Sequence, residues 1–280
     1  MDRSLEVVES VGERYELDAD TALRELGDGR YLAMVSERWE VGPGPNGGYL
    51  AALLLRAALE ESSLPDPLTM TVHYLSRPET TSCEIEARAL RVGRGHAFYR
   101  LELVQSGEVR CAALVTLGRL REAGSHDFQP DAPSVPGPES SSALLRVGGE
   151  VPLWERVEQR VARAEDAFFL RSEPGEAKTG GWTRLADGRP TDALAVAVFL
   201  DCWPPAVFGR TLEPDPAGAP TIEYTVHWRH RPGSDWCHAS FETRAYTGGY
   251  VDEQGALFDK EGRLVAESRQ LARYGGGPRP

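Results

Sequence analysis

One carboxylate in the chain stands in a setting that suits acid–base chemistry. Asp201 lies in the apolar segment F-L-D-C-W (199–203), near the end of a predicted helix that Pro204 and Pro205 must terminate. The helix dipole disfavours an acidic side chain near a helix C-terminus, so its presence there asks for a reason. Burial would raise the pKa of Asp201 into a range useful for a general base, which takes a proton from an attacking water.

A second candidate site is the start of another predicted helix. Asn46, Gly47 and Gly48 open the apolar segment 47–60, and Asn46 is a suitable N-cap. Glycines there leave bare N–H groups at the positive end of the helix, where a ligand oxygen could bind. Glycines also serve close helix–sheet packing, and the sequence leaves both roles open.

Other sequence patterns exclude several chemistries. His227 and His230 lie on a predicted strand, where residues three apart point to opposite faces and cannot share a metal. The glycine-rich segment before residue 49 lacks the G-K-[ST] ending of a P-loop, and no G-x-S-x-G nucleophile elbow occurs. We therefore predict neither a metal site nor a cofactor.

The chain repeats itself. Residues 71–78 read T-V-H-Y-L-S-R-P and residues 225–232 read T-V-H-W-R-H-R-P, so five of eight positions are identical at an offset of 154. At the same offset, Cys83 matches Cys237 and Gly95 matches Gly249. Several matches at one offset indicate two copies of one structural unit.

Each half is predicted to contain a buried helix between strands. The segments Gly47–Glu60 and Asp192–Trp203 are apolar on nearly every side, which is typical of a buried helix. Runs of strand-like residues separated by Gly-containing turns surround each helix. In the first half they are Tyr31–Val41, Cys83–Val92, Ala97–Gln105 and Glu108–Arg119; in the second they are Gly181–Leu185 with part of Glu155–Ala164, Cys237–Thr247, Gly255–Asp259 and Arg263–Tyr274.

This order predicts an α+β fold in which two antiparallel sheets each wrap a buried central helix, because an all-round apolar helix must be covered. We expect an N-terminal unit at 1–121 and a C-terminal unit at 152–280. The Pro/Gly/Ser-rich segment 122–151 has the composition of a linker.

Charge and hydropathy limit the partners and the location. The 280 residues carry a formal net charge of −12, from 31 basic and 43 acidic side chains. Nucleic acid and anionic membranes repel such a surface, so neither is expected as a partner. The longest apolar stretches, 49–55 and 193–200, are far shorter than the roughly 20 residues of a membrane helix, and no signal peptide is evident. A cytoplasmic location is expected.

Two longer patterns resemble a known family. The segment W-x-V-G-x-G-P-N-G-G-Y-L-A-A-L-L-L-R-A from Trp39 is similar to the first half of thioesterase II-type acyl-CoA thioesterases, which are double hotdog proteins. The segments F-L-D-C-W-P-P, T-I-E-Y-T-V-H-W-R-H-R-P and L-V-A-E-S-R-Q resemble their second half. The family's catalytic Asp, Thr or Ser, and Gln are implied to fall on Asp201, Thr221 and Gln270. Thr225 is an alternative to Thr221, because one extra residue before Arg231-Pro232 leaves the register of this strand open. Strand parity does not decide between them, since residues 221 and 225 are expected on the same face.

The resemblance implies hydrolysis of acyl-CoA or acyl-carrier thioesters by a water that Asp201 activates. Asn46, Gly47 and Gly48 are then candidates to bind the thioester oxygen. Two alternatives stay open, a non-catalytic acyl-CoA-binding protein and a pathway enzyme with a different acyl-group reaction. Association into a homo-oligomer is a further expectation from the family.

Overall fold

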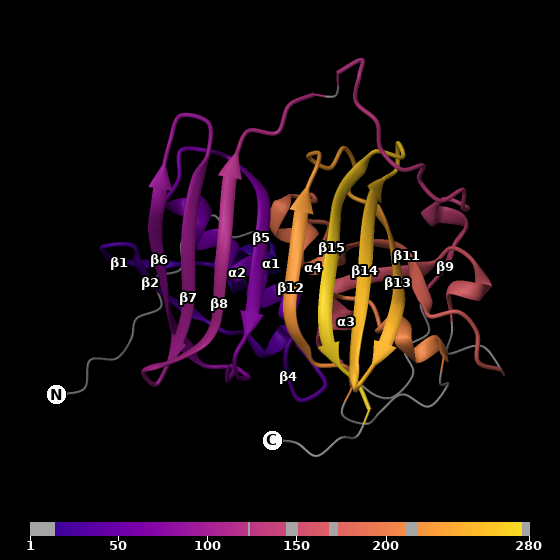
Figure 1. Ribbon diagram of the computed structural model, residues 1–280, viewed down its shortest axis with the longest axis horizontal. Coiled ribbons are helices and arrows are strands. Elements are labelled where there is room, and N and C mark those ends of the chain that lie inside the picture. The colour runs from indigo at the N-terminus through magenta and orange to yellow at the C-terminus, as the bar shows by residue number, and fades with distance from the viewer. Residues whose placement is uncertain (1–14, 123, 144–150, 168–172, 211–217, 276–280) are drawn as a thin grey trace.

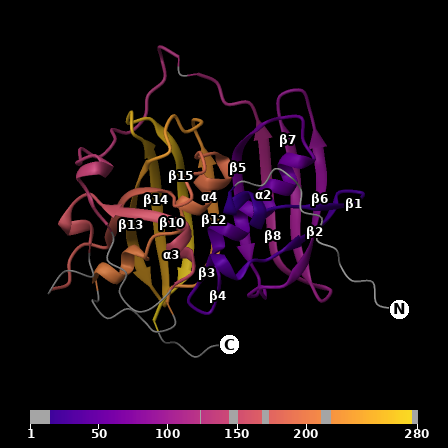
Figure 2. The same ribbon diagram turned by 180° about the vertical axis from the view of Figure 1, so that it is seen from behind.

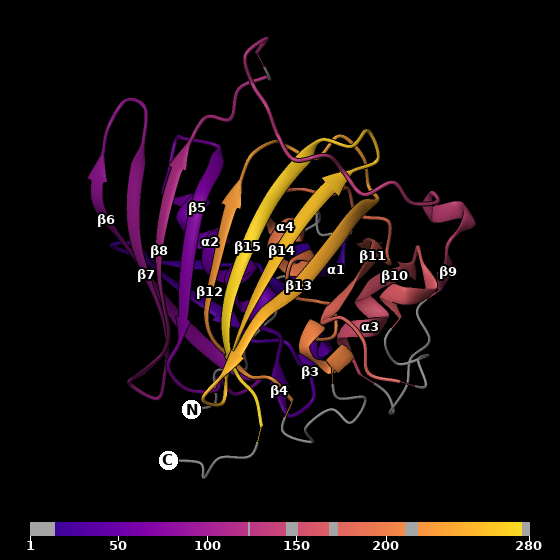
Figure 3. The same ribbon diagram turned by 45° about the vertical axis from the view of Figure 1, so that its right-hand side comes forward.

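The strands join into one curved antiparallel sheet with the two buried apolar helices on its inner face (Figures 1 and 2). The computed structural model describes residues 15–122, 124–143, 151–167, 173–210 and 218–275. Within these residues the sheet has 13 strands in the order β1-β2-β6-β7-β8-β5-β12-β15-β14-β13-β11-β10-β9, and β3 and β4 form a separate pair. The sheet curves around the helices (Figure 3).

The elements follow one another along the chain in two similar series. The first half contains α1 (Glu16–Asp20), β1 (Arg24–Gly27), β2 (Arg30–Met34), the short 3₁₀ helix η1 (Glu37–Trp39), β3 (Glu40–Val41), β4 (Gly44–Pro45), α2 (Gly47–Glu60), β5 (Asp66–Tyr74), β6 (Ser82–Val92), β7 (Ala97–Gln105) and β8 (Glu108–Gly118). The second contains η2 (Pro138–Ser140), β9 (Ser142–Ala143), α3 (Leu153–Arg156), β10 (Val157–Val161), η3 (Ala164–Asp166), β11 (Lys178–Leu185), α4 (Ala193–Phe199), η5 (Ala206–Arg210), β12 (Thr221–Trp228), β13 (Cys237–Thr247), β14 (Tyr250–Asp259) and β15 (Leu264–Arg273).

The expectation of two separate sheets is wrong, because β5 and β12 pair along their edges. In this antiparallel pair Thr71 lies directly opposite Thr225, and their hydroxyl oxygens are 2.8 Å apart. These two residues hold the same position in the sequence repeat, so a local pseudo-twofold axis passes between them. Arg231 also donates two hydrogen bonds of 2.7 Å to the Asp66 carboxylate across the same junction.

The repeat is confirmed by the strand order on each side of this axis. Moving outward, β5, β8, β7 and β6 are mirrored by β12, β15, β14 and β13. Irregularities in strand pairing also recur at equivalent positions of the two halves. The register shifts between Pro67 and Thr69 in β5, and between Thr221 and Glu223 in β12, at the offset of 154. The two halves are therefore the same unit even in local defects of pairing.

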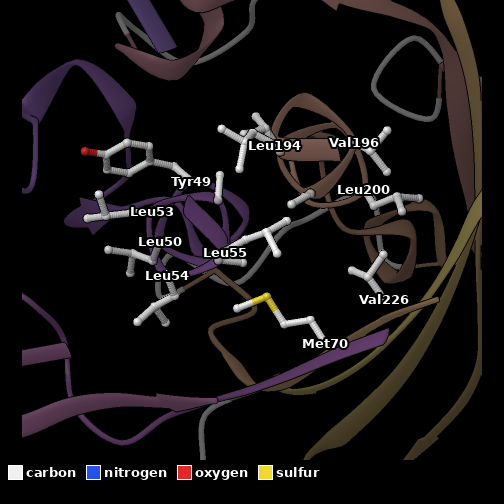
Figure 4. Packing of buried hydrophobic residues seen from close by; sticks show 14 of the residues in the cluster. Tyr49, Leu50, Leu53, Leu54, Leu55, Met70, Leu194, Val196, Leu200 and Val226 are labelled. Carbon is white, nitrogen blue, oxygen red and sulfur yellow. The ribbon is translucent and has the colours of Figure 1, made fainter. Parts of the chain in front are cut away.

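The two apolar helices fill the space inside the sheet (Figure 4). Helix α2 spans the predicted residues, and Asn46 accepts a hydrogen bond from the Tyr49 amide as its N-cap. Helix α4 begins after the predicted cap Asp192 but ends at Phe199, four residues earlier than predicted. The chain tightens there, because the Asp201 amide bonds to the Val198 carbonyl at 3.0 Å and two prolines follow.

Most predicted strands occur with small changes in their ends. β7 and β13 span the predicted residues, whereas β14 begins five residues before the predicted Gly255. The predicted strand Tyr31–Val41 is interrupted, because η1 begins after Met34 with the Ser36 hydroxyl accepting from the Arg38 amide.

Part of the predicted linker packs on the second half. The side chain of Gln129 bonds to both the Gly262 carbonyl and the Leu264 amide, at 2.8 and 3.0 Å. The Trp182 indole donates to the Pro136 carbonyl at 2.7 Å, and β9 pairs with β10. Residues 144–150 of the predicted linker lie outside the described residues.

The close packing of α2 on α4 predicts a specific intolerance to a methyl group. A Cβ at Gly48 would lie 2.6 Å from the Ala197 carbonyl oxygen and 3.0 Å from the Val198 Cα. We expect Gly48→Ala to lower the free energy of unfolding by about 1–3 kcal/mol, as overpacking does. Urea unfolding measures the change. The control is Gly95→Ala, where a Cβ meets no atom within 4 Å and the effect should stay within about 0.5 kcal/mol. Equal effects of both substitutions would contradict the packing argument.

Candidate active site

Asp201 lies where the two halves meet. It follows α4, and its carboxylate faces the N-terminus of α2 from the other half. Oδ2 accepts hydrogen bonds from the Gly48 amide at 2.7 Å and from the Asn46 side-chain amide at 2.9 Å. The same Asn46 nitrogen donates to the Asp201 carbonyl at 2.8 Å. A helix N-terminus suits a carboxylate, because its amides are free and its dipole is positive there.

The predicted ligand donors Asn46 and Gly48 are thus occupied by Asp201. The sequence left open whether the glycines expose donors or permit close packing. The structure shows close packing: a Cβ at Gly47 would lie 2.9 Å from the Tyr74 hydroxyl and 3.0 Å from Asp201 Oδ2. Both glycines let α2 approach the second half closely enough for its amides to reach this carboxylate. In this arrangement Asn46 and Gly48 position an acid and do not face an open ligand site.

Gln270 connects Asp201 to Thr221. Gln270 lies on β15 and is 6 % exposed, and its side-chain nitrogen donates to Asp201 Oδ1 at 2.9 Å. Its side-chain oxygen accepts a hydrogen bond from the Thr221 hydroxyl at 2.8 Å. The three predicted residues therefore form one hydrogen-bonded chain. The Thr221 bond fixes which end of the Gln270 amide faces the carboxylate.

Thr225 is not part of this chain. Its hydroxyl bonds to Thr71 and Glu223 on the outer face of the sheet, whereas the neighbouring Tyr224 and Val226 are buried on the inner face. The parity argument, which put 221 and 225 on one face, is wrong because the register shift after Thr221 turns its side chain inward.

The environment of Asp201 brings the pKa of its carboxyl group close to neutral pH. Desolvation by burial raises the pKa of Asp201 to about 6, and the hydrogen bonds from Gly48, Gln270 and Asn46 oppose that rise. The residue remains partly accessible to solvent. Such a carboxyl is ionised at neutral pH yet basic enough to accept a proton, which is the requirement for a general base.

The sequence did not single out Tyr74 for the site. Its hydroxyl donates to the Gly47 carbonyl at 2.7 Å and so holds the first turn of α2 in place. Burial, together with the charge of Asp201, keeps the pKa of Tyr74 well above its usual value, so the hydroxyl stays a donor. Its only sequence signal is the aromatic match with Trp228 in the repeated octet.

The described residues hold neither a metal-binding cluster nor a membrane-spanning helix. No group of three or more His, Cys, Asp or Glu side chains there could hold a metal ion. No helix in the same part of the chain is long and apolar enough to cross a membrane.

Comparison with protein families identifies the group to which this fold and site belong. A model described as the acyl-CoA thioesterase N-terminal domain matches residues 35–118, and one described as the C-terminal domain matches residues 127–274. The chain belongs to the acyl-CoA thioesterase family. Both matched segments contribute to the Asp201 site, the first through α2 and the second through Gln270.

Individual relatives agree with this family. An uncharacterized protein of Mycobacterium tuberculosis is 25% identical over 264 residues, which are 85% of this chain and 88% of that protein. A provisionally assigned thioesterase II of Thermobifida fusca has a TM-score of 0.85 and 26% identity, covering 94% of this chain and 98% of its own. A hot dog fold protein of unknown function from Alicyclobacillus acidocaldarius gives the same values. The α+β hotdog class is thereby shown.

The contacts of Asn46 predict two separable effects of removing its side chain in this thioesterase-family protein. Asn46→Ala deletes the cap of α2 and a donor to the Asp201 carboxylate. We expect the free energy of unfolding to fall by about 1–3 kcal/mol. We also expect the pKa of Asp201 to rise above about 6, because a bond that favours the charged form is lost.

Urea unfolding and a carboxyl titration by NMR measure the two quantities. The control is Asp192→Ala, which deletes the cap of α4 and should lower stability without changing the pKa of Asp201. An unchanged Asp201 titration in Asn46→Ala would contradict the assigned contact.

Proposed function

We propose that the chain hydrolyses acyl-CoA or related acyl thioesters to the free acid and the thiol, with Asp201 as general base. The observation that carries this proposal is the hydrogen-bonded chain from Thr221 through Gln270 to Asp201, whose carboxyl has a pKa of about 6. The chain that contains these residues belongs to the acyl-CoA thioesterase family.

The proposed reaction needs one water and no metal or covalent intermediate. Asp201 takes a proton from the water as its oxygen attacks the thioester carbonyl carbon. The tetrahedral intermediate then collapses, the carbon–sulfur bond breaks, and the proton held by Asp201 passes to the departing thiolate. Gln270 and Thr221 orient the carboxylate and the water. Asn46 and Gly48 keep the carboxylate ionised and fixed.

One site per chain follows from the repeat. Pro67 stands at the position equivalent to Thr221, and Val115 stands at the position equivalent to Gln270, because Val115 pairs with Met70 as Gln270 pairs with Tyr224. Neither residue can donate a side-chain hydrogen bond. The first half would then serve the reaction through α2 and its cap Asn46, which Tyr74 helps to hold in place.

The same proposal covers the domain organisation. We infer a double hotdog, with units at 1–121 and 152–280 and α2 and α4 as their central helices. The mirrored strand order about the Thr71–Thr225 pair and the two family matches support it. The substrate partner is an acyl thioester, carried by CoA or by a carrier protein.

Loss of the base predicts loss of turnover. Asp201→Asn should lower kcat by about 10²–10⁴-fold, the usual contribution of a general base. In the wild type, kcat/KM should rise with pH through about 6, because the ionised carboxylate is the active form. The measurement is thiol release from acyl-CoAs of short to long chain. If folded wild-type protein binds acyl-CoA but releases no thiol, it is a binding protein; release with transfer to another acceptor would indicate a different acyl reaction.

The two threonines give a matched pair of variants. Thr221→Val removes the donor to Gln270 and should lower kcat about fivefold, since a lost hydrogen bond is worth roughly 1 kcal/mol. Thr225→Val removes a hydroxyl from the outer face and should leave kcat unchanged while lowering stability by about 1 kcal/mol. Steady-state kinetics on one acyl-CoA compares them. A larger loss in Thr225→Val would overturn the assignment of Thr221.

A further inference from the structure

A row of polar side chains crosses three strands beside Asp201. Thr243 on β13 lies opposite Glu253 on β14, and Glu253 lies opposite Gln270 on β15. The equivalent row in the first half reads Ala89, Tyr99 and Val115. The half that contains Asp201 thus has a carboxyl group next to Gln270 where the other half has an aromatic ring.

Glu253 points to the inner side of the sheet. Its Oε2 accepts a hydrogen bond from the Ala206 amide at 2.6 Å. Ala206 follows Pro204 and Pro205, which have no N–H, so it offers the first backbone donor after Trp203. This bond ties the turn that follows Asp201 to the strand beside Gln270. Glu253 therefore holds the turn after Asp201 through its side chain and pairs with Gln270 through its backbone.

Asp201 is the charged residue that affects the ionisation of Glu253. Burial raises the pKa of Glu253 to about 7, the Ala206 amide opposes that rise, and the charge of Asp201 adds to it. Other ionisable residues on its own strand and on the elements packed against it are not among the causes of this shift: Asp252, Arg210, Glu242, Arg244, Arg269 and Arg273. Of these, Asp252 and Arg269 pair with each other.

We propose that Glu253 is a further positioning residue of the active site, which in its protonated form holds the turn after Asp201 beside Gln270 and whose ionisation suppresses the reaction. The inference rests on the proposed thioester hydrolysis. A neutral Glu253 carboxyl accepts the Ala206 bond without adding charge. An ionised Glu253 places a second negative charge near the oxyanion and thiolate that the reaction must form, which raises the barrier.

The consequence is an alkaline fall in activity. The active form has Asp201 ionised and Glu253 protonated, so kcat/KM should rise through about 6 and fall above about 7. In Glu253→Gln the amide keeps the Ala206 bond and stays neutral at every pH. At one pH unit above the Glu253 pKa, about a tenth of the wild type keeps the proton, so the variant should be about tenfold more active there.

The experiment compares kcat/KM against pH for the wild type, Glu253→Gln and Glu253→Ala. Glu253→Ala loses the Ala206 acceptor, so it should lose both the alkaline fall and about tenfold in kcat, which Gln restores. The matched control is Glu242→Gln, which removes an exposed carboxyl from the neighbouring strand and should keep the wild-type profile. An alkaline fall that persists in Glu253→Gln overturns the inference.

A second measurement does not depend on activity. The infrared difference between wild type and Glu253→Gln should contain the carbonyl stretch of a protonated carboxyl below the Glu253 pKa and lose it above. A Glu253 carboxyl already ionised at about pH 6 overturns the inference even if thioesters are hydrolysed. Absence of any hydrolysis, with the infrared change present, instead contradicts the proposed function and leaves the protonated Glu253 in need of another reaction.

Discussion

The contact between the Asp201 carboxylate and the N-terminus of α2 is the interaction on which the site depends. It joins a carboxylate of the second half to amides of the first, so it exists only when both halves are in place. Burial alone would favour the neutral acid, and the amide donors alone would make the carboxylate a weak base. The two effects together leave Asp201 with a pKa of about 6. Gly47 and Gly48 are required because any side chain would hold the helix away.

The repeat provides a symmetric frame that carries asymmetric chemistry. Strand order, register shifts and the Thr71–Thr225 pair all obey the pseudo-twofold relation. Each half also donates one buried helix to a common core. The symmetric features build the sheet and the core, whereas the polar residues around Asp201 have no counterparts in the first half. Residues that act on Asp201 can therefore differ between the halves while the shared sheet pairing is kept.

Much of the fold could be predicted from the sequence, because local signals determine it. Apolar residues on all sides of α2, a capping Asn46, and glycine-containing turns between strands are legible without tertiary information. That the two sheets join into one could not be predicted from the sequence. It depends on which strand edges meet, and β5 and β12 present only alternating polar residues such as Thr71 and Thr225. The inward orientation of the Thr221 side chain could not be predicted either, since no residue type marks the register shift here.

The candidate site was partly predictable for the same reason. Asp201 is conspicuous as an acid in an apolar segment, and Gln270 follows from the family resemblance. What Asn46 and Gly48 bind could not be deduced, because their partner comes from 153 to 155 residues away. Glu253 was missed because residues 252–254 are all acidic or polar. Such a run does not indicate which of its side chains faces the inner side of the sheet.

Desolvated carboxyl groups so close together are costly to maintain, since each disfavours the ionisation of the other. The first half shows the alternative: Tyr99 and Val115 occupy the positions equivalent to Glu253 and Gln270 and are buried with 2 % exposure each. A chain selected only for stability would gain from apolar residues in both halves. The polar row is kept where Asp201 is, and the cost is therefore best understood as serving the chemistry of that carboxylate.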